Sequence, residues 1–301
     1  MTARVLLFGS MVMVWAITSI AAKAAEQTFN TPTLERIAQT GKIRIGYGAT
    51  APFSFRTEDG QVIGYSIDIC RRVVDRLKDK LKLPKIDIEF VARTPSNRVQ
   101  LLNDGSMDIE CNASTNSVER RKSASFAYSH FYGGTRYVSL SRNDLKKIED
   151  LKGRSVSVAL GTVNVSDINE INRTRKLNIS VVPVESLQAA FDMVSDGRVS
   201  AFAMDEVLLR TMIAQTAKPE DYTLSQELVT EAQPIGFMMR LNDTEFVSAV
   251  NDELAEIYKS PEMPEIYRRW FESPIPGLNI NLNLPMSAVV REALSNPKLM
   301  Q

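Results

Sequence analysis

The sequence predicts an α/β protein of two lobes, each a mainly parallel sheet flanked by helices. Short β-rich runs alternate with amphipathic stretches, which is typical of a parallel sheet with helices on its faces. The alternation occurs twice, before and after residues 131–134, and residues 234–239 form a further β-rich run that leads back to the first half. We therefore expect a discontinuous first lobe, 25–134 and 231–301, and a second lobe, 135–230.

Hydrophobic spacing assigns the individual elements. The amphipathic stretch over 66–81 carries Ile67, Val73, Val74 and Leu77 at helical spacing. The expected strands are 42–47, 86–91, 108–111, 136–141, 155–160, 179–184, 201–204 and 234–239. The expected helices are 66–81, 97–103, 165–177, 186–195, 243–259 and 262–271, with a short turn or helix at 148–151.

The N-terminal segment predicts export. Arg4 precedes an apolar stretch over 5–20, and Ala22, Lys23 and Ala24 form a small-residue cleavage site. We expect a signal peptide over 1–24 that is removed near Ala24, which places the mature protein in the periplasm. The alternative is an uncleaved anchor, but the apolar stretch is shorter than the roughly 20 residues of a membrane span.

Charge and composition exclude several partners and groups. The chain has 36 basic and 36 acidic residues, and this balance does not suggest nucleic-acid binding. A basic cluster over 71–85 also carries Asp75 and Asp79, so we expect a solvated helix face. Two cysteines and one histidine cannot form an ordinary zinc site, and we expect neither metal nor cofactor.

The two cysteines leave an alternative open. Cys70 and Cys111 lie too far apart for a CxxC redox motif. In an exported chain a disulfide between them is permitted. Either they form one, or both are small buried side chains.

A carboxylate-binding pattern follows the strand expected at 108–111. Ser114 and Thr115 supply hydroxyl groups, and Arg120 supplies a planar guanidinium that matches two carboxylate oxygens. The alternative is a Ser/Asn-rich turn that caps a helix, with Arg120 on the surface. Because ligands of α/β proteins lie at the carboxyl ends of parallel strands and in clefts between domains, we favour the binding interpretation.

Asp205 occupies the equivalent position in the second lobe. It follows the apolar run over 201–204, where its carboxylate could pair with an ammonium group or cap a helix that begins near Glu206. If Arg120 and Asp205 bind one ligand, that ligand is a zwitterion, as an amino acid is. Arg98 stands at a helix start, where a cation is unfavourable for the helix dipole, so it is either solvated or serves a ligand. Phe53 and Phe55 are candidates for the cleft wall, although for one of the two we favour packing in the core.

Enzymatic signatures are sparse. His130 is the only histidine, and no G-x-S-x-G motif accompanies any serine. Residues 46–48 contain only a fragment of a dinucleotide-binding motif and precede a proline instead of a helix. We therefore expect a binding protein in which His130 is structural.

Taken in order, these residues resemble the type II periplasmic solute-binding proteins of polar amino-acid ABC transporters, solute-binding protein family 3. The resemblance is strongest to the glutamate/aspartate-binding branch, and it covers essentially the whole mature chain. It rests on Gly46 and on residues 52–55, 64–68, 97–98, 101–102, 108–111, 115–120, 161–162, 204–206, 208–209 and 281–283.

The resemblance implies an amino acid clamped between hinged lobes. Arg120 then holds the α-carboxylate and Asp205 the α-ammonium group. Thr115 and Thr162 fall on or beside hydroxyl contacts, and Arg98 matches an arginine of the acidic-substrate branch.

The chain departs from that branch in three places. The branch carries an arginine in the loop after the first strand, where this chain has residues 48–50, and a histidine where Leu187 or Gln188 aligns. One of its binding serines is replaced by Ala113. The identity of the amino acid, polar or acidic, therefore stays open.

The expected function is that of an exported, monomeric receptor that captures an amino acid and delivers it to an inner-membrane ABC permease. Two alternatives remain. One is a periplasmic dehydratase-like enzyme on the same fold, with Glu110 or His130 as acid or base. The other is a sensory receptor that serves a signalling partner.

Overall fold

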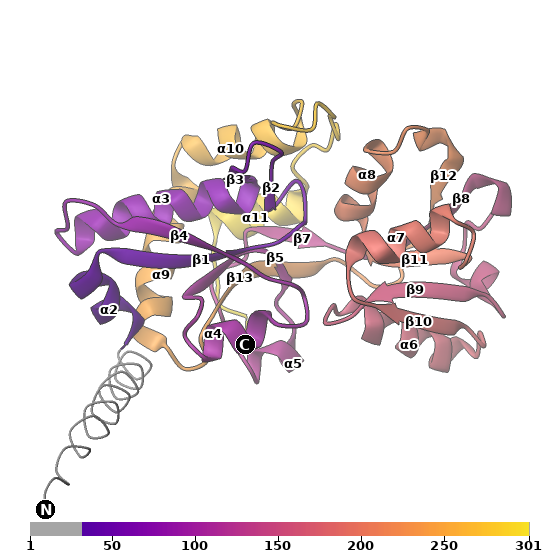
Figure 1. The fold of residues 1–301 in the computed structure, drawn as a ribbon, viewed down its shortest axis with the longest axis horizontal. Coiled ribbons are helices and arrows are strands. Elements are labelled where there is room, and N and C mark those ends of the chain that lie inside the picture. Colours follow the sequence, from indigo (N-terminus) through magenta and orange to yellow (C-terminus); the bar gives the residue numbers. More distant parts are fainter. Residues whose placement is uncertain (1–31, 301) are drawn as a thin grey trace, which may run out of the picture.

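The computed structural model describes residues 32–300, and the predicted signal peptide over 1–24 lies outside them. Two lobes lie side by side, joined by segments that run between them (Figure 1). The chain builds most of the first lobe, forms the second, and then returns to the first. The predicted two-lobed α/β fold is confirmed.

The first lobe contains a six-stranded sheet. Its strands are β1 (Lys42–Tyr47), β4 (Asp87–Ala92), β5 (Ile109–Thr115), β6 (Ser125–Phe126), β7 (Phe131–Gly133) and β13 (Gln233–Met239). The order is β4-β1-β5-β13-β6, with β7 also paired to β13. β4, β1 and β5 are parallel, whereas β13 is antiparallel to β5 and brings the returning chain into this sheet. A separate hairpin pairs β2 (Phe55–Arg56) with β3 (Val62–Ile63).

The second lobe repeats this plan with five strands. They are β8 (Thr135–Leu140), β9 (Ser155–Ala159), β10 (Ser180–Val184), β11 (Ala201–Asp205) and β12 (Tyr222–Leu224). The order is β10-β9-β11-β8-β12. β10, β9 and β11 are parallel, and β8 and β12 complete the sheet in antiparallel pairing. Each sheet is therefore mixed, and its three parallel strands end at one edge.

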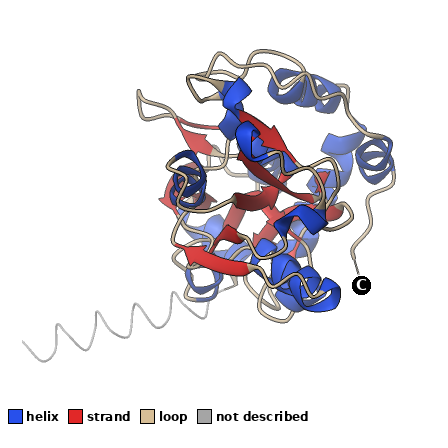
Figure 2. Ribbon diagram, turned by 90° about the vertical axis from the view of Figure 1, so that its right-hand side faces the viewer, coloured by secondary structure: helices blue, strands red, loops and turns tan. Residues whose placement is uncertain are grey.

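Helices lie against the sheets of both lobes (Figure 1), and the side view shows those of the second lobe in front (Figure 2). The first lobe has α2 (Thr33–Thr40), α3 (Tyr65–Lys80), α4 (Arg98–Asn103), α5 (Val118–Arg121), α9 (Thr244–Lys259), α10 (Glu262–Phe271) and α11 (Ala288–Ser295). The second has α6 (Asn164–Arg175), α7 (Leu187–Ser195) and α8 (Glu206–Ala214), with short 3₁₀ turns at Ser141–Asn143, Ile148–Leu151 and Pro219–Asp221. Among residues 32–300, none of the helices is long and apolar enough to cross a membrane.

A disulfide joins Cys70 of α3 to Cys111 of β5. Both residues are buried in the first lobe's core, where α3 packs against β5. This decides the alternative that the sequence left open. The bond fixes a helix to the strand whose carboxyl end carries Ser114 and Thr115.

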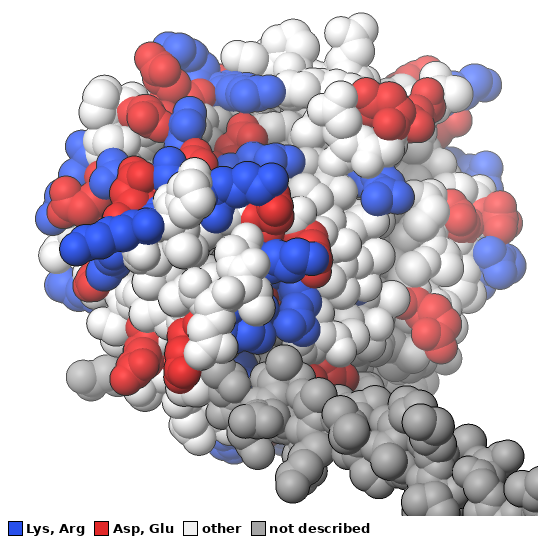
Figure 3. Space-filling model, turned by 60° about the vertical axis from the view of Figure 1, so that its left-hand side comes forward, with Lys and Arg blue, Asp and Glu red and all other residues white. Residues whose placement is uncertain are grey.

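The basic residues of α3 lie on the surface, as the sequence predicts. Lys, Arg, Asp and Glu side chains intermingle on the face seen in Figure 3, without a field of one sign. Arg72 pairs with Glu262 at 2.8 Å, and Lys80 pairs with Asp252 at 2.9 Å. These exposed pairs bridge α3 to α10 and α9.

Strand β5 is longer than the sequence predicts. The expected strand ends at Cys111, but Ser114 and Thr115 still pair with β13. Their hydroxyl groups therefore stand on a strand and not in a turn that caps a helix. The cap of α5 is Ser117, whose hydroxyl accepts a hydrogen bond from the Arg120 backbone N–H.

Candidate functional site

Strand ends from both lobes meet around one small cavity of about 20 Å³. In this conformation the cavity is far smaller than the ~300–1,000 Å³ usual for ligand pockets. We call it the small cavity. From the first lobe it is bordered by Thr50, Arg93, Pro95, Arg98, Ala113, Thr115 and Arg120, and from the second by Thr162, Val163, Asn164, Leu187, Met204, Asp205 and Leu208.

Arg120, the last residue but one of α5, reaches across to the second lobe. Its Nη1 donates to the Thr115 carbonyl at 3.1 Å, and its Nη2 donates to the Gly161 carbonyl at 3.0 Å. Burial and, to a smaller extent, the charge of the nearby Arg98 lower the pKa of Arg120 to about 9. The guanidinium is still charged at neutral pH, so a bound anion would offset the free-energy cost of removing this charge from water.

Asp205 ends strand β11 and is 5% exposed. Its carboxylate does not cap α8; its Oδ1 accepts a hydrogen bond from Asn164 Nδ2 at 3.3 Å. Burial raises the pKa of Asp205 to about 6, although the Asn164 hydrogen bond and the Arg120 charge oppose that shift. A carboxylate destabilised in this way gains from a cationic partner in the cavity.

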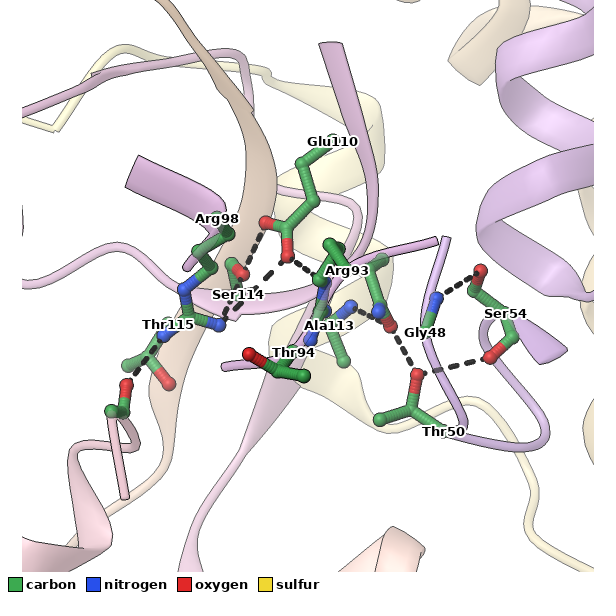
Figure 4. A network of polar contacts seen from close by, with 12 residues as sticks. Gly48, Thr50, Ser54, Arg93, Thr94, Arg98, Glu110, Ala113, Ser114 and Thr115 are labelled. Atoms are coloured by element: carbon green, nitrogen blue, oxygen red, sulfur yellow. Dashed lines mark hydrogen bonds and ion pairs between the residues drawn. The ribbon is translucent and has the colours of Figure 1, made fainter. Parts of the chain in front are cut away.

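A buried ionic network in the first lobe joins Glu110, Arg93, Arg98 and Ser114 (Figure 4). Glu110 is fully buried and lies 2.6 Å from Arg93 Nε and 3.9 Å from Arg98 Nη1. Ser114 Oγ donates to Glu110 Oε2 at 2.5 Å. Burial alone raises the pKa of Glu110, but the Arg93 and Arg98 charges outweigh it and the pKa is lowered.

Arg98 links this network to the second lobe. Its Nη1 donates to Ser114 Oγ at 3.0 Å, and its Nη2 donates to the Gly161 carbonyl at 2.8 Å. Gly161 thus accepts from both Arg98 and Arg120. The two arginines predicted from the sequence therefore form a direct contact between the lobes.

The predicted hydroxyl residues fall into two groups. Thr115 and Thr162 border the small cavity, and Thr162 donates its hydroxyl to the Ala159 carbonyl at 2.7 Å. Ser114 does not border the cavity; it lies beneath the surface and bridges Glu110 to Arg98. Ser114 therefore positions the Arg98 side chain and does not itself face the cavity.

Phe53 is not in the cleft wall, which corrects the sequence-based expectation. It is fully buried and packs against Tyr65, Phe131 and Phe271 with ring centroids 5.1–6.0 Å apart. The reason is local: residues 50–54 form a tight turn that folds the ring back onto the core. Phe55 instead borders a second cavity, described next.

This second space, the large cavity, adjoins the first and measures about 420 Å³. It is bordered by Ala49, Thr50, Ala51, Phe55, Arg56, Arg93, Thr94, Pro95, Glu185, Ser186, Leu187, Gln188, Leu208, Thr211, Met212, Gln215 and Leu278. Two of the three departures from the acidic-substrate branch, at 48–50 and 187–188, thus lie on or beside this cavity, whereas Ala113 borders the small cavity.

Two polar residues of the site were not found from the sequence. Arg93 directly follows the parallel strand β4, so the strand-end rule that selected Asp205 could have selected it as well. Asn164 is the first residue of α6 and holds Asp205. Only the second lobe's three-dimensional arrangement places it there, and no motif marks it.

Comparison with known proteins identifies the family of this chain. Residues 43–273 match the family described as bacterial extracellular solute-binding proteins, family 3. The chain belongs to this family. Among family 3 relatives, an L-glutamate/L-aspartate-binding protein of Pseudomonas aeruginosa is 34% identical over 269 residues, 89% of each chain. A glutamate/aspartate import solute-binding protein of Escherichia coli is 32% identical over 266 residues, 88% of each chain.

One solved structure with this fold is related to an enzyme. The ancestral amino acid-binding protein AncCDT-1, a precursor of cyclohexadienyl dehydratase, matches with a TM-score of 0.67 and 26% identity. The match covers 79% of this chain and 99% of that one. The fold therefore includes a lineage that leads to an enzyme.

Proposed function

We propose that this family 3 protein is the substrate-binding component of an amino-acid ABC transporter, and that it captures a polar or acidic amino acid between its lobes. One observation carries the proposal. The Arg120 guanidinium and the Asp205 carboxylate border the same small cavity from opposite lobes. That arrangement suits the α-carboxylate and α-ammonium groups of one amino acid.

The charge of the cleft supports an anionic ligand. Arg93, Arg98 and Arg120 contribute three positive charges, while Glu110 and Asp205 contribute two negative ones at neutral pH. A ligand with one net negative charge, such as glutamate or aspartate, balances this site. The names of the two curated relatives agree with that choice.

The enzyme alternative lacks a suitable acid or base. Burial lowers the pKa of His130 to about 3, and its ring stacks on Phe237 at 4.4 Å between centroids. Glu110 is held ionised by Arg93 and Arg98. Neither His130 nor Glu110 borders the small or the large cavity. A residue that exchanges protons with a substrate must come within hydrogen-bond reach of it, and these two do not.

We further propose the setting in which the protein works. It is exported to the periplasm, loses residues 1–24, acts as a monomer, and presents its closed form to an inner-membrane permease. The lobes, 25–134 with 231–301 and 135–230, close on the ligand as a hinge motion. Ligand contacts made by both lobes favour the closed form.

A thermal-shift panel of α-amino acids and dicarboxylates tests the proposal. Ligand at about 100 times its Kd stabilises a protein by roughly 2.7 kcal/mol, so a binding amino acid raises Tm measurably. Arg120→Ala should remove the shift. Arg121→Ala is the matched control, because this neighbour on α5 donates to Asn116 and does not border the cavity. A panel in which no α-amino acid raises Tm contradicts the proposal, as does full affinity in Arg120→Ala.

A further inference from the structure

The small and large cavities meet at a few shared residues, and one of them is charged. The shared residues are Thr50, Arg93, Pro95, Leu187 and Leu208. Arg120 and Asp205, in contrast, border the small cavity alone. A ligand whose two charged ends lie on Arg120 and Asp205 therefore extends the rest of its structure towards Arg93.

Arg93 has hydrogen-bonding capacity left over. Its side chain is 2% exposed, and its ion pair with Glu110 uses Nε. Within the described part of the chain, its Nη1 and Nη2 make no hydrogen bond, whereas both terminal nitrogens of Arg98 bind protein oxygens. Buried donors are normally satisfied, so the N–H groups of Nη1 and Nη2, four in all, are available to a ligand at the cavity wall.

The backbone beside Arg93 leaves room for its guanidinium. A Cβ atom at Gly48 would lie 3.2 Å from Arg93 Cζ and 3.3 Å from its Nη1. It would also lie 2.6 Å from Asn112 Nδ2. Figure 4 shows Arg93 between Glu110 and the loop that carries Gly48 and Thr50. A Cβ atom at position 48 would clash with Asn112 Nδ2 and would crowd the Arg93 guanidinium.

We propose that Arg93 is a specificity-determining residue that receives a side-chain carboxylate of the ligand on Nη1 and Nη2, while Glu110 fixes the orientation of the guanidinium. The inference rests on the proposed function, since it requires an amino acid in the small cavity. A carboxylate accepts two parallel N–H bonds from a guanidinium, whereas a side-chain amide offers one acceptor oxygen and a repelled NH₂ group. Arg93 therefore discriminates glutamate from its neutral isostere glutamine.

Calorimetric titration with L-glutamate and L-glutamine tests this role. The wild-type protein should prefer glutamate, and Arg93→Met should reduce the glutamate-to-glutamine preference by about 10- to 100-fold, the value of a hydrogen bond to a charged group. Affinity for glutamine should change little. Because Arg93→Met leaves Glu110 short of a partner, the double variant Arg93→Met/Glu110→Gln gives a second measurement with the buried charges removed together.

Arg71→Met is the matched control. Arg71 borders neither cavity, and its guanidinium lies over the Phe90 ring. This variant should keep the wild-type preference. Two results would contradict the role of Arg93 and leave the proposed function standing. One is a wild-type protein that binds glutamine as tightly as glutamate; the other is a wild-type preference that is kept by the folded Arg93 variants. A wild-type protein that binds no α-amino acid overturns the proposed function, and this inference with it.

Discussion

At the scale of single residues, the site is defined by charges that the fold holds in unfavourable surroundings. Asp205 and Arg120 are both largely removed from water, and burial shifts the pKa of each towards its neutral form. Protein partners compensate only in part. A zwitterionic ligand supplies the missing counter-charges, so the cost of burying these groups is recovered in binding.

Asp205 predicts a pH dependence. With a pKa of about 6 in the ligand-free protein, Asp205 takes up a proton as the pH falls, and an ammonium ligand must then displace that proton. The Kd for L-glutamate should stay constant above about pH 7 and rise about tenfold between pH 7 and pH 5. Calorimetry in buffers of different ionisation enthalpy measures both the Kd and the proton release. Asp205→Asn should bind weakly at every pH, without this slope; a flat wild-type profile contradicts the assignment.

Sequence reasoning located residues whose position follows from a strand end. Arg120, Asp205 and Thr115 stand close behind apolar runs, so topology alone places them at the cleft. The prediction for Phe53 was wrong because an aromatic side chain near a strand end can point either into the cleft or into the core. Arg93 was not predicted because its role depends on two features that are distant in sequence. These are the ion pair with Glu110 and the space left by the missing side chain at Gly48.

At the scale of elements, strand β5 organises the site. It carries Glu110 and Ser114 beneath the cavity, Thr115 at its border, and Cys111 in the core. The disulfide to Cys70 fixes it to α3. The sequence placed the start of this strand correctly but ended it early, because Asn and Ser residues are poor strand formers and their pairing with β13 is not visible locally.

The disulfide predicts a stability difference. It closes a loop between residues 41 apart in the sequence, which restricts the unfolded chain. The Cys70→Ala/Cys111→Ala variant should lose about 2–4 kcal/mol of unfolding free energy in urea titrations followed by circular dichroism. Reductant should lower the wild-type midpoint towards that of the variant and leave the variant unchanged. Equal midpoints for oxidised wild type and variant would show that the bond contributes no stability.

At the scale of the whole molecule, the lobes are in close contact where Gly161 meets the loop after β4. A Cβ atom at Gly161 would lie 2.4 Å from the Pro95 carbonyl oxygen. Gly161 has a φ of +78°, and its own carbonyl accepts from Arg98 and Arg120. Closure of the two lobes therefore requires that residue 161 have no side chain.

Gly161→Ala should therefore impede closure. The added methyl group meets backbone atoms that cannot move aside, so the Kd for L-glutamate should weaken about 5- to 100-fold, as overpacking of ~1–3 kcal/mol implies. The ligand-induced decrease in radius of gyration, measured by small-angle X-ray scattering, should shrink as well. Gly153→Ala is the control: its φ of +68° brings a similar backbone cost, but nothing lies within 4 Å of the new Cβ. Equal effects of the two variants would assign the loss to backbone strain instead of closure.

The buried His130 makes this protein unusually simple to observe by spectroscopy. It is the only histidine of the chain, and its pKa of about 3 keeps it neutral throughout the range in which histidines ordinarily titrate. Both cysteines are in the disulfide, so neither thiol ionises. Side-chain protonation detected between pH 5 and pH 7 therefore belongs to a carboxyl group. Infrared difference spectra can follow Asp205 directly as a carboxyl band that disappears when the amino acid binds.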